Sequence, residues 1–504
     1  MHLIKLIVTS PFSSPWCGLK GFLLLVFLLS TQTLIAQQNV FEGTYPLGHG
    51  ETAQTLIQTN DSGYVLAGIQ VVGIAYYRAF LIGINKNGIQ QFNRTIGSQG
   101  GLTEITDGIL HNDSVLVFTG SSTDFDSSVQ LMIWRLSKSG DSISTWHYGS
   151  IPNREFGMGI CQAGQNGFVV CGGIVDVSTG NQTNVLVVRF DSLGNPMWNR
   201  SFGGSQVDVA WAVKPTADNG FIVTGFSTSN FASNGPTAFL WKLDSLGQTQ
   251  WLRYYGQESY FGYGYDVVQK PDGGYIFGGI TGHYEPNNNL WRNVPYLVST
   301  NALGDTLWTW RSGFPRGGSI SSIVLKGDEI WAAGDWIFRE NDNRQMLLFR
   351  FSSTGQQLGY SNYGGPGMEE GRHLVKTYDG GFAIAGNNNS SSACVVCSYL
   401  VKTDSNGCVQ PGCIQAVGIQ EHRRDNVNLK LYPSPVVDQL NIESNFEQGQ
   451  LQLQISDMQG RTVHSEQQPA NTEIQLQLSQ LPAGMYLLRI QNGQQSAWAR
   501  FVKR

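Results

Sequence analysis

Two kinds of turn alternate along most of this chain of 504 residues, and their regular spacing constrains the fold more than any other feature. Turns of the first kind end in a glycine and recur every 51 to 57 residues. Each follows a second kind of turn, rich in Asp, Asn and Gly, which tolerate positive φ. Such a repeat is typical of a chain that stacks copies of one supersecondary unit. The glycines of the first series are Gly88, Gly140, Gly194, Gly247, Gly304, Gly355 and Gly407, and the clearest turns of the second series are 61–64, 218–221, 272–275 and 379–382.

Short apolar or alternating segments lie between the turns, for example at 64–67, 168–171 and 238–241. Such segments, bounded by turns of this composition, predict β-hairpins. Each unit then holds four antiparallel strands, and one such sheet buries both faces only by stacking on neighbours. Seven units predict an all-β, seven-bladed β-propeller over residues 37–413. Two smaller propellers or an open solenoid are alternatives, but no linker composition interrupts the series.

The two ends of the repeat region complement each other. The seventh unit has no fourth strand after Gly407, because the chain continues as CVQP. Residues 41–45 (FEGTY) align without a gap with 198–202 (WNRSF), the fourth strand of the third unit. We therefore expect the N-terminal strand, residues 39–46, to complete the last blade, which removes an open sheet edge.

Residues 1–36 have the composition of a signal peptide. Lys5 and Lys20 precede the short apolar segment 21–29, and Ala36 ends an approximate cleavage site. The apolar segment is too short to span a bilayer, so we expect a mature chain without a transmembrane helix. We expect export through the periplasm to the outer cell surface or the medium. The net charge of −5, with no cluster of Lys or Arg, argues against nucleic acid and anionic membranes as partners.

The sequence changes character after Cys413. Residues 414–427 are polar and predict a linker. Residues 428–504 include alternating segments such as LQLQI at 451–455, which predict a small antiparallel β-sandwich with one buried face per sheet. An ordinary immunoglobulin-like adhesive module would show the same alternation.

Both regions resemble known families. Residues 39–413 are similar to the kelch-like propellers with DGG turns of exported bacterial proteins, a resemblance that implies a fold but not an activity. The C-terminal segment resembles the type A-like sorting domain of the type IX secretion system of Gram-negative bacteria, with Ser434 at a position where asparagine is usual. This resemblance implies contact with the secretion machinery and passage across the outer membrane, followed by removal of the domain or surface attachment. The residues that carry it are Tyr432, Pro433, Pro435, Gly460, Gly484, Tyr486 and Lys503.

Six cysteines follow the signal segment, an even number that is compatible with disulfides in an exported protein. Cys161 and Cys171 flank the turn at 165–167 symmetrically, so a bond across this hairpin is one expectation. The other four lie close together and allow three pairings, and their spacing also resembles a zinc-ligand set. They are Cys394, Cys397, Cys408 and Cys413.

Four carboxylates occupy equivalent positions where the chain enters the innermost strand of a unit: Glu51, Glu155, Asp208 and Glu369. Innermost strands surround the channel of a propeller, so we expect these side chains to gather at one mouth. They could hold a calcium ion or act as acid and base in glycoside hydrolysis. A structural role is the alternative, in which each carboxylate accepts hydrogen bonds from backbone amides.

The same face should display the variable loops between the second and third strands of each unit. Aromatic side chains on such loops are a common means of binding glycans or peptides. The candidate binding residues are Tyr76, Tyr77, Phe231, Tyr284, Trp291, Trp336 and Phe338.

No catalytic motif appears in the chain: it contains neither a His-Glu-x-x-His pair nor a Gly-x-Ser-x-Gly turn. The sequence therefore favours an exported protein that binds a polysaccharide or a protein through the loop-rich face. A glycoside hydrolase or polysaccharide lyase that uses the carboxylates is the alternative from another class. A structural component of the cell surface is a third.

Overall fold

The computed structural model describes residues 39–504 except for 49, 74–75, 99, 125–127, 166, 181, 230–234, 257–259, 286–289, 313–316, 338–342, 390–394, 411–414, 417–428, 434, 445–449, 458–461, 470–472 and 493–494. The predicted signal segment thus lies outside the described residues. The described chain is all-β apart from one short 3-10 helix, η1 (Val177–Thr179). None of its helices is long and apolar enough to cross a membrane.

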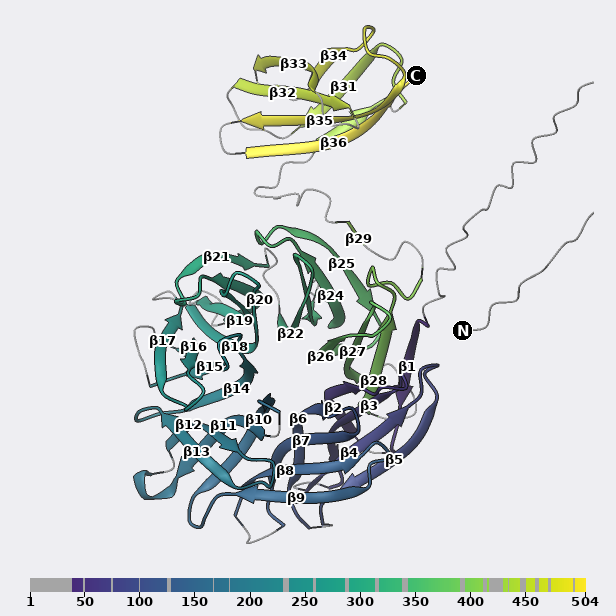
Figure 1. Ribbon diagram of the computed structural model, residues 1–504. Coiled ribbons are helices and arrows are strands. Elements are labelled where there is room, and N and C mark those ends of the chain that lie inside the picture. Colours follow the sequence, from purple (N-terminus) through teal and green to yellow (C-terminus); the bar gives the residue numbers. More distant parts are fainter. Residues whose placement is uncertain are drawn as a thin grey trace, which may run out of the picture. The chain divides into compact units, whose positions relative to one another are not determined.

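The repeat region forms seven antiparallel sheets in the described part of the chain, and they surround a common centre (Figure 1). The first four sheets follow the chain in order, from the innermost strand outward. They are β2 (Gly50–Gln58), β3 (Tyr64–Val71), β4 (Tyr77–Ile84) and β5 (Gln90–Ile96); β6 (Thr103–His111), β7 (Val115–Ser122), β8 (Gln130–Ser137) and β9 (Ser142–Tyr148); β10 (Arg154–Ala163), β11 (Gly167–Asp176), β12 (Gln182–Phe190) and β13 (Pro196–Phe202); and β14 (Asp208–Pro215), β15 (Phe221–Ser227), β16 (Thr237–Leu243) and β17 (Thr249–Tyr255).

The remaining three sheets repeat this plan with two additions. A two-residue strand, β29, pairs with the outer strand of the sixth sheet, and the N-terminal strand β1 pairs with β28 of the seventh. These sheets are β18 (Tyr260–Gln269), β19 (Tyr275–Glu285), β20 (Leu290–Thr300) and β21 (Thr306–Arg311); β22 (Gly318–Lys326), β23 (Glu329–Trp336), β24 (Gln345–Phe351), β25 (Gln357–Tyr363) and β29 (Gln415–Ala416); and β26 (Glu369–Lys376), β27 (Phe382–Asn388), β28 (Cys397–Thr403) and β1 (Phe41–Tyr45).

Apolar side chains between neighbouring sheets hold this region together. Each sheet shares a buried cluster with the next one, as between the third and fourth sheets, where Val187 packs with Phe239. One cluster joins the seventh sheet to the first and includes Tyr45, Leu66 and Leu400. Because each sheet is covered on both faces by its neighbours, the strands in the middle of each sheet are almost wholly buried. The arrangement is propeller-like.

The strand β1 makes the same contacts as the outer strands of other sheets. Gly194, with φ of 90°, lies so close to Trp146 of the preceding sheet that an added Cβ would be 2.2 Å from the ring. Gly88 lies against Phe41 of β1 in the same way. The Tyr45 hydroxyl donates to the Gly88 carbonyl at 2.8 Å. The equivalent hydroxyl of Tyr255, in β17, donates to a turn glycine at 2.7 Å.

Every innermost strand carries a β-bulge at the equivalent position. In β2 the register shifts between Ala53 and Thr55, so Gln54 is the extra residue. A bulge bends its strand and turns an extra side chain away from the regular alternation. The seven extra residues are Gln54, Thr106, Met158, Trp211, Tyr265, Ser321 and Arg372.

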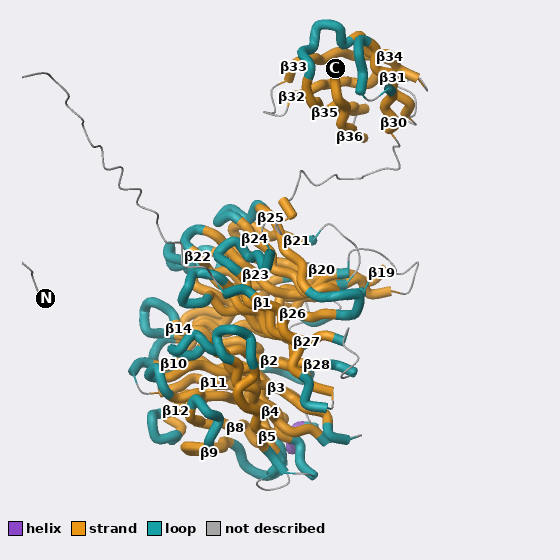
Figure 2. Tube along the Cα trace, turned by 90° about the vertical axis from the view of Figure 1, so that its right-hand side faces the viewer, coloured by secondary structure: helices purple, strands orange, loops and turns teal. Residues whose placement is uncertain are grey.

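The C-terminal module consists of two antiparallel sheets (Figure 2). In β32 (Gln450–Asp457) the residues Leu451, Leu453 and Ile455 are buried. Gln452, which alternates with them, is exposed, as the sequence pattern predicts. Residues of both sheets, among them Ile442 and Leu488, form one apolar cluster. The sheets are β30 (Leu429–Tyr432), β31 (Gln439–Ser444) and β34 (Glu473–Gln477); and β33 (Thr462–Pro469), β32 (Gln450–Asp457), β35 (Gly484–Asn492) and β36 (Gln495–Lys503).

Candidate functional site

Two cavities lie along the centre of the propeller-like region. One, which we call the polar pocket, has a volume of about 380 Å³ and lies where the innermost strands begin. The other, the apolar cavity, has a volume of about 600 Å³ and lies toward the ends of the same strands. The polar pocket is thus on the face where the sequence predicts the variable loops.

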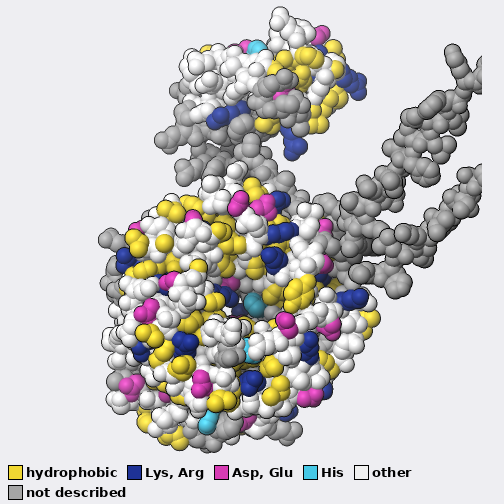
Figure 3. Space-filling view, viewed as in Figure 1, with side chains coloured by type: hydrophobic (Ala, Val, Ile, Leu, Met, Phe, Trp, Pro, Cys, Tyr) yellow, Lys and Arg dark blue, Asp and Glu magenta, His cyan; other side chains and the backbone are white. Residues whose placement is uncertain are grey.

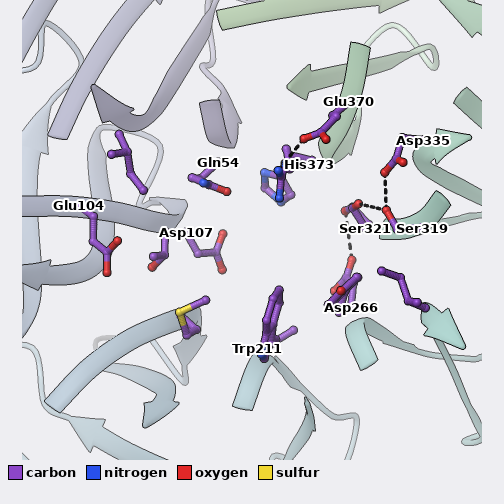
Figure 4. Close-up of a pocket in the computed structure, with 18 of the residues that line it drawn as sticks. Gln54, Glu104, Asp107, Trp211, Asp266, Ser319, Ser321, Asp335, Glu370 and His373 are labelled. Atoms are coloured by element: carbon purple, nitrogen blue, oxygen red, sulfur yellow. Dashed lines mark hydrogen bonds and ion pairs between the residues drawn. The ribbon is translucent and has the colours of Figure 1, made fainter. Parts of the chain in front are cut away.

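The bulges build the wall of the polar pocket. All seven of the extra residues in the innermost strands line it, each from a different sheet. The seven bulge residues differ in chemistry. The pocket therefore has an aromatic side and a charged side, although seven similar sheets surround it. Figure 4 shows Trp211 facing Glu370 and His373 across the pocket.

The aromatic side consists of Trp211 and Tyr265 from neighbouring sheets. Their rings lie 4.5 Å apart at an interplanar angle of 31°. Tyr263 and Phe226 extend the cluster, with ring centroids 4.8 Å apart. Trp211 and Tyr265 are half-buried, so part of each ring remains open to the pocket. Such a surface offers the flat apolar face on which the C–H face of a sugar ring packs.

The charged side is a chain of ion pairs that ends on a serine. Arg372 pairs with Glu370 at 2.6 Å, and Glu370 pairs with Arg344 at the same distance. Arg344 also approaches Asp335, at 3.3 Å between its Nε and Oδ2. The Ser319 hydroxyl donates to Asp335 Oδ1 at 2.5 Å. Arg344 precedes β24, so a loop residue connects two sheets at the pocket.

Two carboxylates in this series of ion pairs, Asp335 and Glu370, have pKa values displaced in opposite directions. Burial raises the pKa of Asp335 to about 6, although Arg344 and Ser319 oppose the shift. Burial also acts to raise the pKa of Glu370, but Arg372 and Arg344 outweigh it and hold that pKa below its usual range. At neutral pH both groups are ionised, and Asp335 is the one that gains a proton on mild acidification.

Three polar atoms in the wall have no hydrogen-bond partner within the described chain. They are Asp335 Oδ2, which has only its ion pair with Arg344, and the donors Arg372 Nε and Trp211 Nε1. Buried polar atoms in folded proteins nearly always have partners, and leaving one without costs about 1–3 kcal/mol. A ligand hydroxyl, which both donates and accepts, is a partner that suits either kind of atom.

A layer of polar residues separates the polar pocket from the apolar cavity. Lys214 approaches Asp266 at 3.5 Å, and both line the two cavities. Asp107 accepts hydrogen bonds from Thr55 and from the Ile160 amide of the next sheet. Asp266 and His373 accept backbone amides of their next sheets in the same way, from Ile323 at 2.9 Å and Leu56 at 2.9 Å. This layer therefore joins sheets and lies at the inner end of the pocket, where it also borders the apolar cavity.

The four predicted carboxylates begin the innermost strands, but they do not line either cavity. All four are buried, with 0–3% exposure. Asp208 accepts from the Gly204 amide at 3.0 Å and from Ser229, and Glu369 accepts from the Gly365 amide at 3.2 Å. The expected gathering of Glu51, Glu155, Asp208 and Glu369 at the channel mouth is therefore wrong, because strand alternation turns them away from the channel.

In two sheets a carboxylate one position later lines the pocket. Glu104 follows Thr103, the equivalent of Glu51, and Glu370 follows Glu369. Both line the pocket, and Ser121 donates to Glu104 at 2.7 Å. In these two strands the sequence signal was therefore present, one residue further along. The bulge residues carry no signal of their own before the register is known.

The predicted aromatic binding residues differ in how far they are exposed. Tyr76 and Tyr77 are exposed, at 47% and 37%, as predicted, although Tyr77 is the first residue of β4. Trp336 is 2% exposed and packs against Phe349, so its prediction as an exposed binding residue is wrong. Tyr284 and Trp291 pair across β19 and β20, and their side chains lie outside the described set. Phe231 and Phe338 lie outside the described residues altogether.

The cysteine prediction is wrong for the hairpin pair. Cys161 and Cys171 are buried free thiols. The hairpin pairs Cys161 with Val169 and Cys171 with Gly159, so the two cysteines are not opposite each other. Burial raises the pKa of the Cys161 thiol to about 12, which keeps it protonated. Cys397 and Cys408 are buried, but Cys394 and Cys413 lie outside the described residues, so the pairing of these four stays a prediction.

No group of three or more His, Cys, Asp or Glu residues is placed to hold a metal ion within the described ranges. The possible calcium ion at the channel mouth therefore gains no support from the four carboxylates, which point away from it. The zinc alternative for the cysteines involves residues outside those ranges.

The residues of the predicted sorting motif support the C-terminal module. Tyr486 stacks on Phe501 at 5.6 Å and its hydroxyl donates to the Pro482 carbonyl at 2.8 Å. Lys503 is buried at the end of β36, and Gly484 begins β35. Tyr432 ends β30, next to exposed Pro433 and Pro435. Gly460 lies outside the described residues.

Comparisons with solved structures find propeller-like neighbours of low sequence identity. The α-L-arabinanase of Penicillium chrysogenum complexed with arabinobiose is 10% identical, with a TM-score of 0.42 over 73% of this chain and 98% of that one. The β-propeller domain of the Trilobed protease from Pyrococcus furiosus is 7% identical, with a TM-score of 0.38 over 72% and 93%. These likenesses carry no argument about function. No curated protein matches the chain.

One family model matches the chain, at residues 430–504, and it describes the secretion system C-terminal sorting domain. The match covers the two sheets of the C-terminal module and agrees with the motifs found in the sequence. The chain therefore carries a C-terminal type IX sorting domain, which indicates export to the cell surface or into the medium.

Proposed function

We propose that this protein is an exported binding protein whose repeat region is a closed seven-bladed β-propeller that recognises a polysaccharide at the polar pocket. In this proposal residues 1–36 are a signal peptide, 37–413 the propeller, 414–427 a linker and 428–504 a sorting β-sandwich. The buried cluster between the seventh and first sheets and the pairing of β1 with β28 support the closed ring. Its DGG turns are those of a kelch-like propeller.

The observation that carries the ligand class is the combination within one pocket of an aromatic surface and polar atoms without partners. Trp211 and Tyr265 provide the surface, and Asp335 and Arg372 provide an acceptor and a donor. Pockets that bind small ligands pair an apolar wall with a few polar groups that fix orientation. A protein ligand on the exposed loop residues Tyr76 and Tyr77, or a purely structural role at the cell surface, would not need these unpaired atoms.

A glycan-array screen of residues 37–504 tests the proposal, followed by titration calorimetry on the tightest glycan. We expect binding that is lost in Trp211→Ala and kept in Tyr76→Ala, which removes an exposed aromatic residue outside the pocket. Equal loss in both variants, with both folded, would place the ligand on the loops. No glycan bound at all would move the proposal to a protein partner.

A second candidate function is glycoside hydrolysis, and the opposed pKa values of Asp335 and Glu370 favour it specifically. An acid with a pKa near 6 beside a carboxylate that stays ionised is the pattern of an acid and base pair. Arg344 holds the two groups in one network. Breakdown of the bound glycan that disappears in Asp335→Asn, with binding kept, would establish an enzyme, whereas binding without turnover would exclude this candidate.

A further inference from the structure

The charge of the polar pocket distinguishes between classes of sugar. Among the described residues that line it, five are acidic (Glu104, Asp107, Asp266, Asp335, Glu370) and three are basic (Lys214, Arg344, Arg372), which leaves two negative charges in excess. His373 accepts the Leu56 amide through Nδ1, and burial lowers its pKa, so it stays neutral. Figure 3 shows that, on the face it views, a His side chain lies near the centre of the propeller-like region.

An anionic sugar would enter this pocket against its net charge. The three cations are already committed, since Arg372 and Arg344 pair with Glu370 and Lys214 approaches Asp266. A uronic acid or sulfated sugar would need a cation free of such a partner to compensate its desolvation. Hydroxyl groups carry no such requirement and satisfy both the acceptor Asp335 Oδ2 and the donor Arg372 Nε.

The shape of the pocket limits how a chain can enter it. The wall comes from all seven sheets, so side chains surround the pocket laterally and it is not a groove across the face. Its floor is the layer of Asp107, Lys214, Asp266, Ser322 and His373, which also borders the apolar cavity beyond. Hydrogen bonds of Asp107, Asp266 and His373 to neighbouring sheets fix that layer in place. A polysaccharide chain therefore cannot lie through the pocket with sugar on both sides.

We propose that the polar pocket takes the terminal residue of a neutral polysaccharide, which enters end first and packs against Trp211 while its hydroxyls reach Asp335 and Arg372. This inference rests on the proposed function, since it specifies the ligand of the same site. A volume of about 380 Å³ limits the enclosed part to a short end segment. Sugar residues further from the end of the polysaccharide lie outside the pocket and add little to the affinity.

Titration calorimetry on residues 37–504 with defined oligosaccharides tests the inference. The probes are neutral gluco-, xylo-, manno- and galacto-oligosaccharides of two to eight residues, oligogalacturonides of the same lengths, and cyclic glucans without ends. We expect a neutral linear series to bind, with affinity that rises up to two or three residues and is then constant. Oligogalacturonides should bind at least about tenfold more weakly, and cyclic forms should not bind.

Three variants connect this result to the pocket. Trp211→Phe keeps an aromatic ring but removes Nε1–H, and Arg372→Lys keeps the charge but removes Nε–H. Each should weaken binding by about tenfold, as expected for losing one buried hydrogen bond to a ligand. Val375→Thr, a nearly isosteric change in the apolar cavity, is the matched control and should bind as the wild type does.

The outcomes separate the inference from the proposed function. Affinity that rises steadily to eight residues, equal binding of cyclic glucans, or preference for oligogalacturonides would overturn end-first binding of a neutral sugar while leaving polysaccharide recognition intact. Unchanged affinity in both Trp211→Phe and Arg372→Lys would remove the site from the pocket. Absence of binding by every probe would overturn the proposed function and this inference together.

Discussion

The polar pocket and the apolar cavity are built from the same innermost strands, yet they differ in chemistry. The pocket is lined by the bulge residues and by charged side chains, whereas the cavity is lined largely by aliphatic residues such as Ile57, Ile109 and Val268. The polar layer between them joins neighbouring sheets through hydrogen bonds. The comparison shows where the repeated sheets differ from one another. They differ at the bulge and at the start of the innermost strand, where no two sheets carry the same set of residues.

The largest effect is expected from a deletion that opens the circle of seven sheets, whose innermost strands form both cavities. Deleting residues 37–46 removes β1 and with it the buried Tyr45 and the contact of Phe41 with the Gly88 turn. Loss of a large buried aromatic residue alone costs about 3–5 kcal/mol, so we expect the melting temperature to fall by roughly 10 °C or more. Thermal unfolding by circular dichroism measures this. An unchanged melting temperature would contradict ring closure by β1.

Tyr45→Phe serves as the mild counterpart of the deletion. It removes only the hydrogen bond to the Gly88 carbonyl and should cost about 1 kcal/mol.

Two tryptophans test whether stability and binding reside in different places. Trp336 is buried in the cluster between the fifth and sixth sheets, so Trp336→Ala should cost about 3–5 kcal/mol of folding free energy. Trp211 is half-buried at the pocket, so Trp211→Ala should abolish glycan binding with a smaller loss of stability. Urea unfolding and calorimetric titration of both variants give the comparison. A folded Trp336→Ala protein that loses binding selectively would reverse the assignment.

The free energy of unfolding should depend on pH through Asp335, which lines the polar pocket and not the apolar cavity. Burial raises the pKa of Asp335 to about 6 in the folded state, against roughly 3.9 when unfolded. The group therefore favours the folded state below pH 4, and this contribution is lost as the pH rises from about 4 to 6. A displacement of two units corresponds to on the order of 3 kcal/mol.

Urea unfolding between pH 4 and 7 measures this contribution. Asp335→Asn carries no titrating group, so its stability should fall less than that of the wild type over this interval. Parallel profiles for the two proteins would show that Asp335 does not titrate there.

The last prediction concerns the hairpin cysteines, where the effect is also small. Because Cys161 is a free thiol, Cys161→Ala should cost no more than about 1–2 kcal/mol, the loss expected from a small change in a packed core. Removing a native disulfide would instead cost about 2–5 kcal/mol. The melting temperatures of Cys161→Ala and Cys161→Ala/Cys171→Ala should be similar. Alkylation of both cysteines in the unfolded, unreduced wild type provides an independent measurement, and its failure would indicate a bond.

The sequence predicts the sheets well and the site poorly, for a physical reason. Turn glycines and alternating strands are local signals, so the four-stranded units could be read from spacing alone, and even the pairing of β1 follows from the alignment of 41–45 with 198–202. The orientation of a side chain on the innermost strand depends on register, and a shift of one residue turns it to the other face. The sequence alone thus predicts Glu369 at the channel mouth, whereas Glu370 lines the pocket.

The bulges add a second obstacle. They place Trp211 and Arg372 in the pocket, but a bulge is defined by the pairing of two strands and not by a residue type. Trp336 illustrates the related error on the loops, since it is the last residue of β23 and packs inward. Repeat spacing therefore locates the face that carries the polar pocket, and only the register identifies the residues that line it.

The most direct measurement is a crystal structure of residues 37–504 with the tightest oligosaccharide from the titrations. The account predicts one terminal sugar in the polar pocket, packed on Trp211, with hydroxyls within hydrogen-bond distance of Asp335 Oδ2 and Arg372 Nε. Sugar bound on the loops around Tyr76 and Tyr77, with none in the pocket, would contradict it.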